Sequence, residues 1–128
     1  MNILIVEDQV DALEVLRRLL VRIGHQITGA TKLAEARAAC ESGHFDLMIC
    51  DLLLPDGSGL ELGEVARQRG IKAIVTSGFD THDFGRQVEQ AGFSDHLIKP
   101  FTLEDLRHSI DRVIPIGKPP PAIAPSHN

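Results

Sequence analysis

Short runs of apolar residues alternate along this chain with longer stretches in which apolar residues recur every three or four positions. The short runs are typical of buried strands and occupy residues 3–6, 26–29, 47–50, 73–76 and 95–98. The longer stretches are typical of amphipathic helices and occupy about residues 10–23, 32–41, 59–69, 83–91 and 103–114. Because short strands alternate with helices, the pattern predicts a parallel sheet covered on both faces, a three-layer α/β sandwich with right-handed crossovers.

A few residues mark the predicted ends of these helices. Gly24 is predicted to be the C′ residue of the first helix, and Thr31 is a candidate N-cap for the second. The last helix is predicted to open with a capping box, in which Asp105 takes the usual place of glutamate and Thr102 is the N-cap. Residues 56–59 are predicted to form a turn, since they lack the full spacing of a nucleophile elbow.

Length and composition indicate one domain. The chain has 128 residues, of which 43% are hydrophobic, and this is enough for a single core. We assign residues 1–115 to this domain. Residues 116–128 are rich in proline and have no amphipathic period, so they are predicted to form a disordered or polyproline II-like tail.

Charge and residue types exclude several classes of function. A net charge of -5, with 18 acidic residues against 13 Lys and Arg, argues against general nucleic-acid binding, and no Trp or Tyr is present to stack on bases. Cys40 and Cys50 lack the spacing of a zinc site or a disulfide framework and are expected to be reduced thiols. The N-terminus has neither a basic segment nor a long apolar stretch, so we expect a cytoplasmic protein that does not span a membrane.

Chemically active side chains follow four of the predicted strands. Glu7 and Asp8 follow the first strand, Asp51 the third, Ser77 the fourth and Lys99 the fifth. The carboxyl ends of parallel strands meet at one edge of the sheet, where such folds bind and react. The sequence therefore predicts that three acids, a lysine and a hydroxyl group come together there.

This set of groups suits metal-assisted phosphoryl transfer. The crowded carboxylates repel one another, and a divalent cation would relieve the repulsion. The candidate ligands are all oxygens, which favours Mg²⁺ over zinc, and Mg²⁺ also accepts phosphate oxygens. Asp51 is the natural nucleophile and would form an acyl phosphate, while Lys99 and Ser77 would position the group and stabilise its charge.

Taken together, these motifs resemble the response regulator receiver domain of two-component signalling. The resemblance covers about residues 2–114 and rests on Glu7-Asp8, the Asp51-Leu52-Leu53-Leu54-Pro55 turn with Gly59 beyond it, Ser77-Gly78 and Lys99-Pro100-Phe101. It implies a flavodoxin-like fold with five helices and a five-stranded parallel sheet in the order 2-1-3-4-5. It also implies that the chain is a phosphoacceptor switch and not a conventional turnover enzyme.

The resemblance assigns roles at the acidic edge. Asp51 would accept a phosphoryl group from a histidine kinase or a histidine phosphotransfer protein. Asp8, Asp51 and the backbone carbonyl of Leu53 would ligate Mg²⁺ directly, and Glu7 would act through bound water. Lys99 would pair with the phosphoryl group, and the peptide bond between it and Pro100 would be cis.

The resemblance also implies a conformational switch. Ser77 would move to hydrogen-bond the phosphoryl group, and phosphorylation would favour one of two existing states, altering the surface of residues 80–114 for a downstream protein. Receivers generally carry Tyr or Phe three residues before the lysine. This chain departs from that pattern with His96, a more polar side chain that can charge near neutral pH. We expect a monomer or a weak dimer.

Three alternatives remain open from the residues. A single-domain regulator is favoured, with protein contact or onward phosphotransfer as its output, because no effector domain follows residue 114. The chain could instead be a receiver module of a hybrid histidine kinase or larger regulator. It could also be an unphosphorylated scaffold or a flavodoxin-like phosphate binder, but the intact acid set and Lys99 argue against a scaffold, and no phosphate loop follows the first strand.

Overall fold

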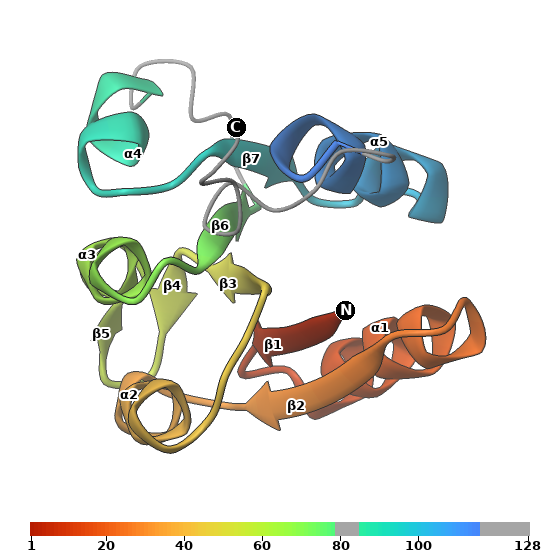
Figure 1. The fold of residues 1–128 in the computed structure, drawn as a ribbon, viewed down its shortest axis with the longest axis horizontal. Helices are drawn as coiled ribbons and strands as arrows, with labels where there is room; N and C mark the ends of the chain where they lie inside the picture. The colour runs from red at the N-terminus through yellow and green to blue at the C-terminus, as the bar shows by residue number, and fades with distance from the viewer. Residues whose placement is uncertain (79–84, 116–128) are drawn as a thin grey trace, which may run out of the picture.

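The computed structural model describes residues 1–78 and 85–115 (Figure 1). Strands and helices alternate along the described chain as the periodicity predicts. In chain order the elements are β1 Asn2–Val6, α1 Val10–Arg22, β2 Gln26–Ala30, α2 Leu33–Ser42, β3 Leu47–Asp51, β4 Leu53–Leu54, β5 Gly57–Ser58, α3 Glu61–Gln68, β6 Lys72–Ser77, α4 Gly85–Gln90, β7 Asp95–Ile98 and α5 Leu103–Val113.

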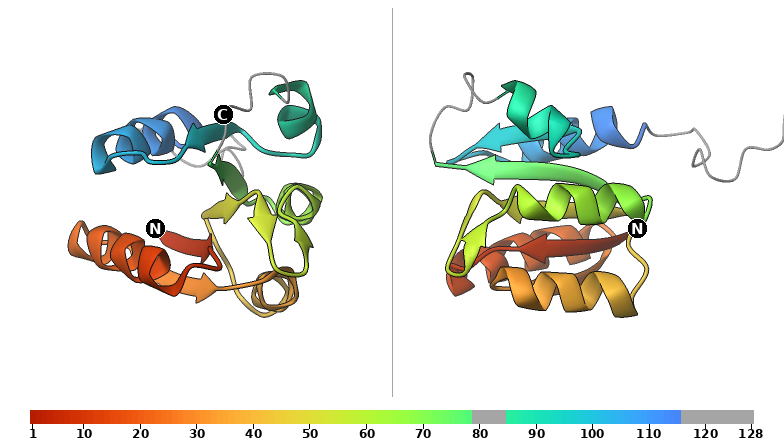
Figure 2. Two further views of the ribbon diagram at one scale, coloured as in Figure 1. Left: turned by 180° about the vertical axis from the view of Figure 1, so that it is seen from behind. Right: turned by 90° about the vertical axis from the view of Figure 1, so that its left-hand side faces the viewer.

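The main sheet has five parallel strands in the order β2-β1-β3-β6-β7. Since β6 and β7 are the fourth and fifth of the predicted strands, the predicted order 2-1-3-4-5 and the flavodoxin-like fold are confirmed. Helices α1 and α5 cover one face, and α2, α3 and α4 cover the other (Figure 1). The right-hand view of Figure 2 shows that the strands run in one direction, so their carboxyl ends share one edge.

The core lies on both faces of the sheet. Successive residues of a strand point to opposite faces, so Ile3 and Ile5 belong to one buried cluster with Leu106 of α5, whereas Leu4 belongs to the other with Leu62 of α3. All five of these side chains are fully buried. A sheet buried on both faces holds its strand ends at defined positions, which is what an active edge requires.

Most of the predicted helix ends are observed. Gly24 has φ +103° and follows Ile23, the C-cap of α1. The capping box of α5 is formed, with the Thr102 hydroxyl accepting the Asp105 N–H at 3.0 Å and the Asp105 carboxylate accepting the Thr102 N–H at 3.0 Å. The prediction for α2 is wrong, because its N-cap is Lys32 and not Thr31.

Two further differences concern the segments around the sheet. Residues 53–58 form a small antiparallel hairpin, β4–β5, where only turns, over 51–55 and 56–59, were predicted. The hairpin was missed because two-residue strands are too short to produce a periodic pattern. Helix α3 begins at Glu61, two residues later than predicted. The predicted start of the fourth helix at residue 83 and the predicted tail, 116–128, lie outside the described residues. No helix in the described segments is long and apolar enough to cross a membrane.

Candidate functional site

The predicted groups meet at the carboxyl edge of the sheet. Glu7 and Asp8 follow β1, Asp51 is the last residue of β3, Ser77 is the last residue of β6 and Lys99 follows β7. These strands are neighbours in the sheet, with β3 between β1 and β6 and with β7 beside β6. The tertiary structure therefore brings together residues that are up to 92 positions apart in the chain.

Three carboxylates form a compact cluster at this edge. Glu7, Asp8 and Asp51 each offer an oxygen, and these oxygens lie within 4.8 Å of one another. Glu7 and Asp51 are 3% and 8% exposed, and Asp8 is half-buried. Buried carboxylates at this spacing need positive charge nearby, and an all-oxygen donor set suits a hard divalent cation. The residues present therefore fit a metal ion of the Mg²⁺ or Ca²⁺ class.

Lys99 contributes positive charge to the cluster. Its Nζ lies 2.7 Å from Oε1 of Glu7 and 3.2 Å from Oδ2 of Asp51. Partial burial favours a lower pKa for Lys99, but the hydrogen bond and charge of Glu7, together with those of Asp51, outweigh burial and raise its pKa. The ammonium group therefore stays charged at neutral pH. The other oxygen of Glu7 accepts the Gln9 N–H at 3.0 Å, so both oxygens of this buried carboxylate are hydrogen-bonded.

The chain after Asp51 folds back tightly against it. The Leu52 carbonyl accepts the N–H of Gly59 at 2.7 Å, closing the segment that contains the β4–β5 hairpin. A Cβ atom on Gly59 would lie 2.0 Å from the carbonyl oxygen of Asp51, so only glycine fits there. The Cys50 thiol donates to the same carbonyl at 3.3 Å, and burial raises the pKa of that thiol, which stays protonated. The phosphoacceptor candidate is thus held by a closed loop.

The predicted switch residues lie on the two neighbouring strands β6 and β7. Ser77 is 2% exposed, and its carbonyl accepts the Lys99 N–H at 2.6 Å. His96 is half-buried, opposite Val75 and two residues before Ile98, the residue that pairs with Ser77. The Lys99–Pro100 peptide bond is cis. His96 lines a shallow hollow with residues of β7, the following loop and α5, which are Leu97, Ile98, Phe101, Asp105, His108 and Arg112.

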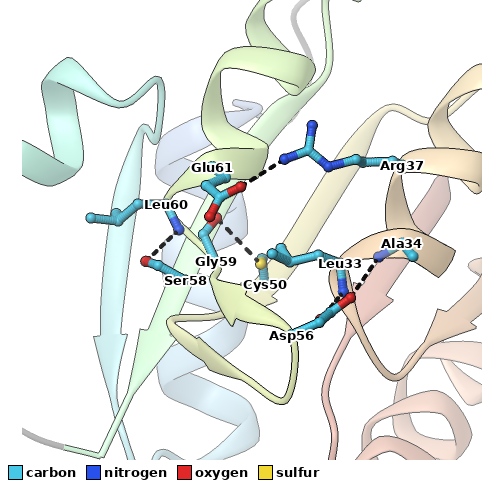
Figure 3. Close-up of polar contacts among 9 residues, drawn as sticks. All are labelled: Leu33, Ala34, Arg37, Cys50, Asp56, Ser58, Gly59, Leu60 and Glu61. Atoms are coloured by element: carbon cyan, nitrogen blue, oxygen red, sulfur yellow. Dashed lines mark hydrogen bonds and ion pairs between the residues drawn. The ribbon is translucent and has the colours of Figure 1, made fainter.

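Sequence reasoning missed the role of one residue in the loop that follows Asp51. Asp56, at the tip of the β4–β5 hairpin, accepts hydrogen bonds from the N–H groups of Leu33 and Ala34 at the start of α2 (Figure 3). The N-cap residue Lys32 provides no side-chain acceptor for the helix start, but this is visible only once the start of the helix is known. The local sequence offered Thr31 as the cap, and the true acceptor is 23 residues away from Leu33.

Comparison with known proteins identifies related sequences. The family model described as the response regulator receiver domain matches residues 3–111. The swarming motility regulation protein RssB of Serratia marcescens is 36% identical over 108 residues, which cover 83% of this chain and 49% of that protein. The chain spans about half the length, or less, of the first curated relatives that it matches.

Solved structures share the fold. A response regulator from Burkholderia pseudomallei, crystallised with a phosphorylated aspartic acid, calcium ion and citrate, has a TM-score of 0.77 and 25% identity, covering 83% of this chain and 64% of that chain. The response regulator TrrA of Thermotoga maritima, in complex with Mg²⁺-BeF, also has a TM-score of 0.77 and 25% identity, covering 88% of this chain and 98% of that chain.

Proposed function

We propose that this chain, which belongs to the response regulator receiver domain family of two-component signalling, accepts a phosphoryl group on Asp51. The observation that carries the proposal is the position of Asp51 at the end of β3, with its carboxylate 3.2 Å from Lys99 and within 4.8 Å of the other two acids. The B. pseudomallei relative that contains a phosphorylated aspartic acid supports this chemistry for the fold.

The proposed step transfers a phosphoryl group from a histidine nitrogen to a carboxylate oxygen of Asp51. A carboxylate oxygen of Asp51 attacks the phosphorus of a phosphohistidine, the O–P bond forms as the N–P bond breaks, and the imidazole leaves with the bonding electrons and takes up a proton. Lys99 stabilises the negative charge of the phosphoryl oxygens, and Ser77 hydrogen-bonds the group after transfer. The donor is a histidine kinase or a histidine phosphotransfer protein. In this role the chain is a phosphoacceptor switch that assists its own modification.

We assign Mg²⁺ to the acidic cluster. Asp8, Asp51 and the backbone carbonyl of Leu53 would bind it directly, and Glu7, whose oxygens are both hydrogen-bonded, would reach it through water. Bound Mg²⁺ offsets the negative charge of the carboxylates and the phosphoryl oxygens. The donor set consists of oxygens only, and the T. maritima relative in complex with Mg²⁺-BeF supports the choice of ion.

Phosphorylation is proposed to change a protein-binding surface at residues 80–114, of which 85–114 are described and include α4, β7 and α5. Ser77 connects this surface to the acidic edge through the backbone hydrogen bond to Lys99. His96 stands where receivers generally carry Tyr or Phe, and its imidazole makes the adjoining hollow more polar. Phosphorylation acts by shifting the populations of two conformational states. The output is contact of the altered surface with a downstream protein.

A second arrangement is a receiver module within a larger regulator or hybrid kinase. The length of the relatives supports this arrangement, because the chain spans half or less of several of them. An immunoblot of the native cells separates the two arrangements. A band near 14.0 kDa indicates a single-domain regulator, and a much larger band indicates a module of a longer protein.

Intact-mass analysis after incubation with acetyl phosphate tests the proposed function. We expect one phosphoryl adduct on the parent protein that requires Mg²⁺ and is absent from Asp51→Asn. Circular dichroism of the variant shows whether its fold is kept. An adduct that persists in Asp51→Asn would refute the assignment of the acceptor. Absence of both the adduct and Mg²⁺ binding in the parent protein would favour an unphosphorylated scaffold.

A further inference from the structure

The first turn of α2 takes its cap from another part of the chain. The N-cap residue Lys32 provides no side-chain cap, and the Glu35 carboxylate accepts hydrogen bonds from the N–H and hydroxyl of Thr31, outside the helix. The first N–H groups of any helix lack partners within it. Those of Leu33 and Ala34 are satisfied by Asp56, with N–O distances of 2.8 Å and 3.1 Å to its two oxygens.

This contact is well suited to hold a charged carboxylate. The hydrogen bond from the Leu33 N–H, supported by the one from Ala34, lowers the pKa of Asp56 although desolvation opposes the shift. Asp56 is therefore ionised at neutral pH, and its negative charge lies at the positive end of the helix dipole. Figure 3 shows the carboxylate at the start of the helix, bridging the two N–H groups.

Packing attaches the same hairpin to α2 beside the cap. Leu54 of β4 is buried and belongs to the same core cluster as Leu33. Gly57 has φ +147°, and a Cβ atom there would lie 2.8 Å from Cδ1 of Leu33, so the hairpin passes directly over that side chain. One turn further along α2, Arg37 forms an ion pair of 2.8 Å with Glu61 at the start of α3 (Figure 3).

The attached hairpin contains a proposed metal ligand. Leu53 is two residues beyond Asp51 and pairs with Ser58 across the β4–β5 hairpin. Its carbonyl oxygen would be one of the metal ligands in the proposed site, and the direction of that carbonyl follows the orientation of the hairpin. The hairpin is held at its base by the hydrogen bond from Gly59 to Leu52 and at its tip by Asp56 on α2. The orientation of the ligand therefore depends on a helix that contributes no side chain to the acidic cluster.

We propose that Asp56 is a positioning residue for the metal site: by capping α2 it holds the β4–β5 hairpin, and with it the Leu53 carbonyl, in the orientation that binds the cation. This inference rests on the proposed function, because it concerns the metal ion used in phosphorylation. Asp56 is not one of the residues proposed to bind the metal or the phosphoryl group. Its effect on both passes through the hairpin.

Mg²⁺ titration of the full chain by calorimetry tests the inference. Asp56→Ala removes both acceptors, and we expect its Mg²⁺ dissociation constant to rise about fivefold, somewhat less than the loss typical of an outer-shell residue in contact with a ligand. Amide hydrogen exchange at Leu33 and Ala34 should become faster. Asp56→Asn keeps one oxygen acceptor and should recover part of the affinity. Glu35→Ala is the matched control, because it removes a carboxylate from the start of α2 whose hydrogen bonds go to Thr31 and not to the hairpin.

The outcomes separate the inference from the proposed function. Weaker Mg²⁺ binding in Asp56→Ala, with affinity within twofold of the parent in Glu35→Ala, supports the positioning role. Unchanged Mg²⁺ affinity in Asp56→Ala and Asp56→Asn, with faster exchange at Leu33, would overturn it and leave a cap that stabilises α2 only. Equal losses in Asp56→Ala and Glu35→Ala would also overturn it. If the parent protein binds no Mg²⁺, the proposed function fails, and the inference fails with it.

Discussion

The contact between α3 and the turn after α4 depends on glycine, so Gly63→Ala should destabilise the fold. A Cβ atom on Gly63 would lie 1.9 Å from the carbonyl oxygen of Ala91 and 2.9 Å from Cε2 of Phe93. The opposing Gly92 has φ +106° and would meet the Gly63 carbonyl at 2.4 Å if it carried a Cβ. The two segments approach each other here through backbone atoms, so no flexible side chain can move aside to relieve the clash.

The size of the effect follows from the distance. Reaching an ordinary contact of 3.4 Å from 1.9 Å requires a backbone shift of about 1.5 Å. Overpacking of this kind costs about 1–3 kcal/mol and occasionally more. Alanine recovers about 1 kcal/mol from its higher helix propensity. Because the obstacle is backbone, we expect the upper end of the cost and a net loss of about 2 kcal/mol in the free energy of unfolding.

Urea unfolding followed by far-ultraviolet circular dichroism measures this loss, and it is the suitable probe because the chain has no Trp. Gly85→Ala is the matched control. Gly85 is the first residue of α4, and a Cβ there would meet nothing within 4 Å, so the same substitution should be neutral or stabilise by up to about 1 kcal/mol. Equal stability of the two variants, at unchanged m-values, would refute the steric argument.

Three further predictions concern charge and packing. Lys99→Met should raise Mg²⁺ affinity about tenfold, about 1.4 kcal/mol, because the ammonium group 2.7 Å from Glu7 competes with the cation for the same carboxylates. Calorimetry measures the affinity, and an unchanged value would show that Lys99 does not compete. Acid should destabilise the protein as pH falls below about 4, because Asp56 and Asp105 have lowered pKa values in the folded state. The stability that these carboxylates contribute is complete above the ordinary pKa of 3.8 and is lost as pH falls through the folded-state values. Urea midpoints between pH 6 and 2 check this, and Asp56→Asn should reduce the slope; an unchanged slope in that variant would contradict the assignment. Leu106→Ala, at a fully buried position of α5, should cost about 2–5 kcal/mol in urea unfolding, and a cost below about 1 kcal/mol would contradict the packing of α5 on the sheet.

Much of the fold could be predicted because its causes are local. The strands β1 and β3 are almost completely buried, so their residues are nearly all apolar, and the helices show one buried stripe, so their apolar residues recur at helical spacing. The hairpin β4–β5 was missed because its short strands leave no period. The cap of α2 was misassigned because Thr31 is a suitable cap by type, while the helix begins two residues later.

The sequence by itself determined which segments become strands and helices, because the period of apolar residues is a property of neighbouring positions. It also determined which reactive side chains follow the strand ends. Only the tertiary structure decided which groups touch. Lys99 lies closer to Glu7 than to Asp51, at 2.7 Å against 3.2 Å. Asp56 caps a helix that begins 23 residues before it in the chain. Such contacts depend on how separate elements pack in three dimensions, and the spacing of residues along one element does not determine that packing.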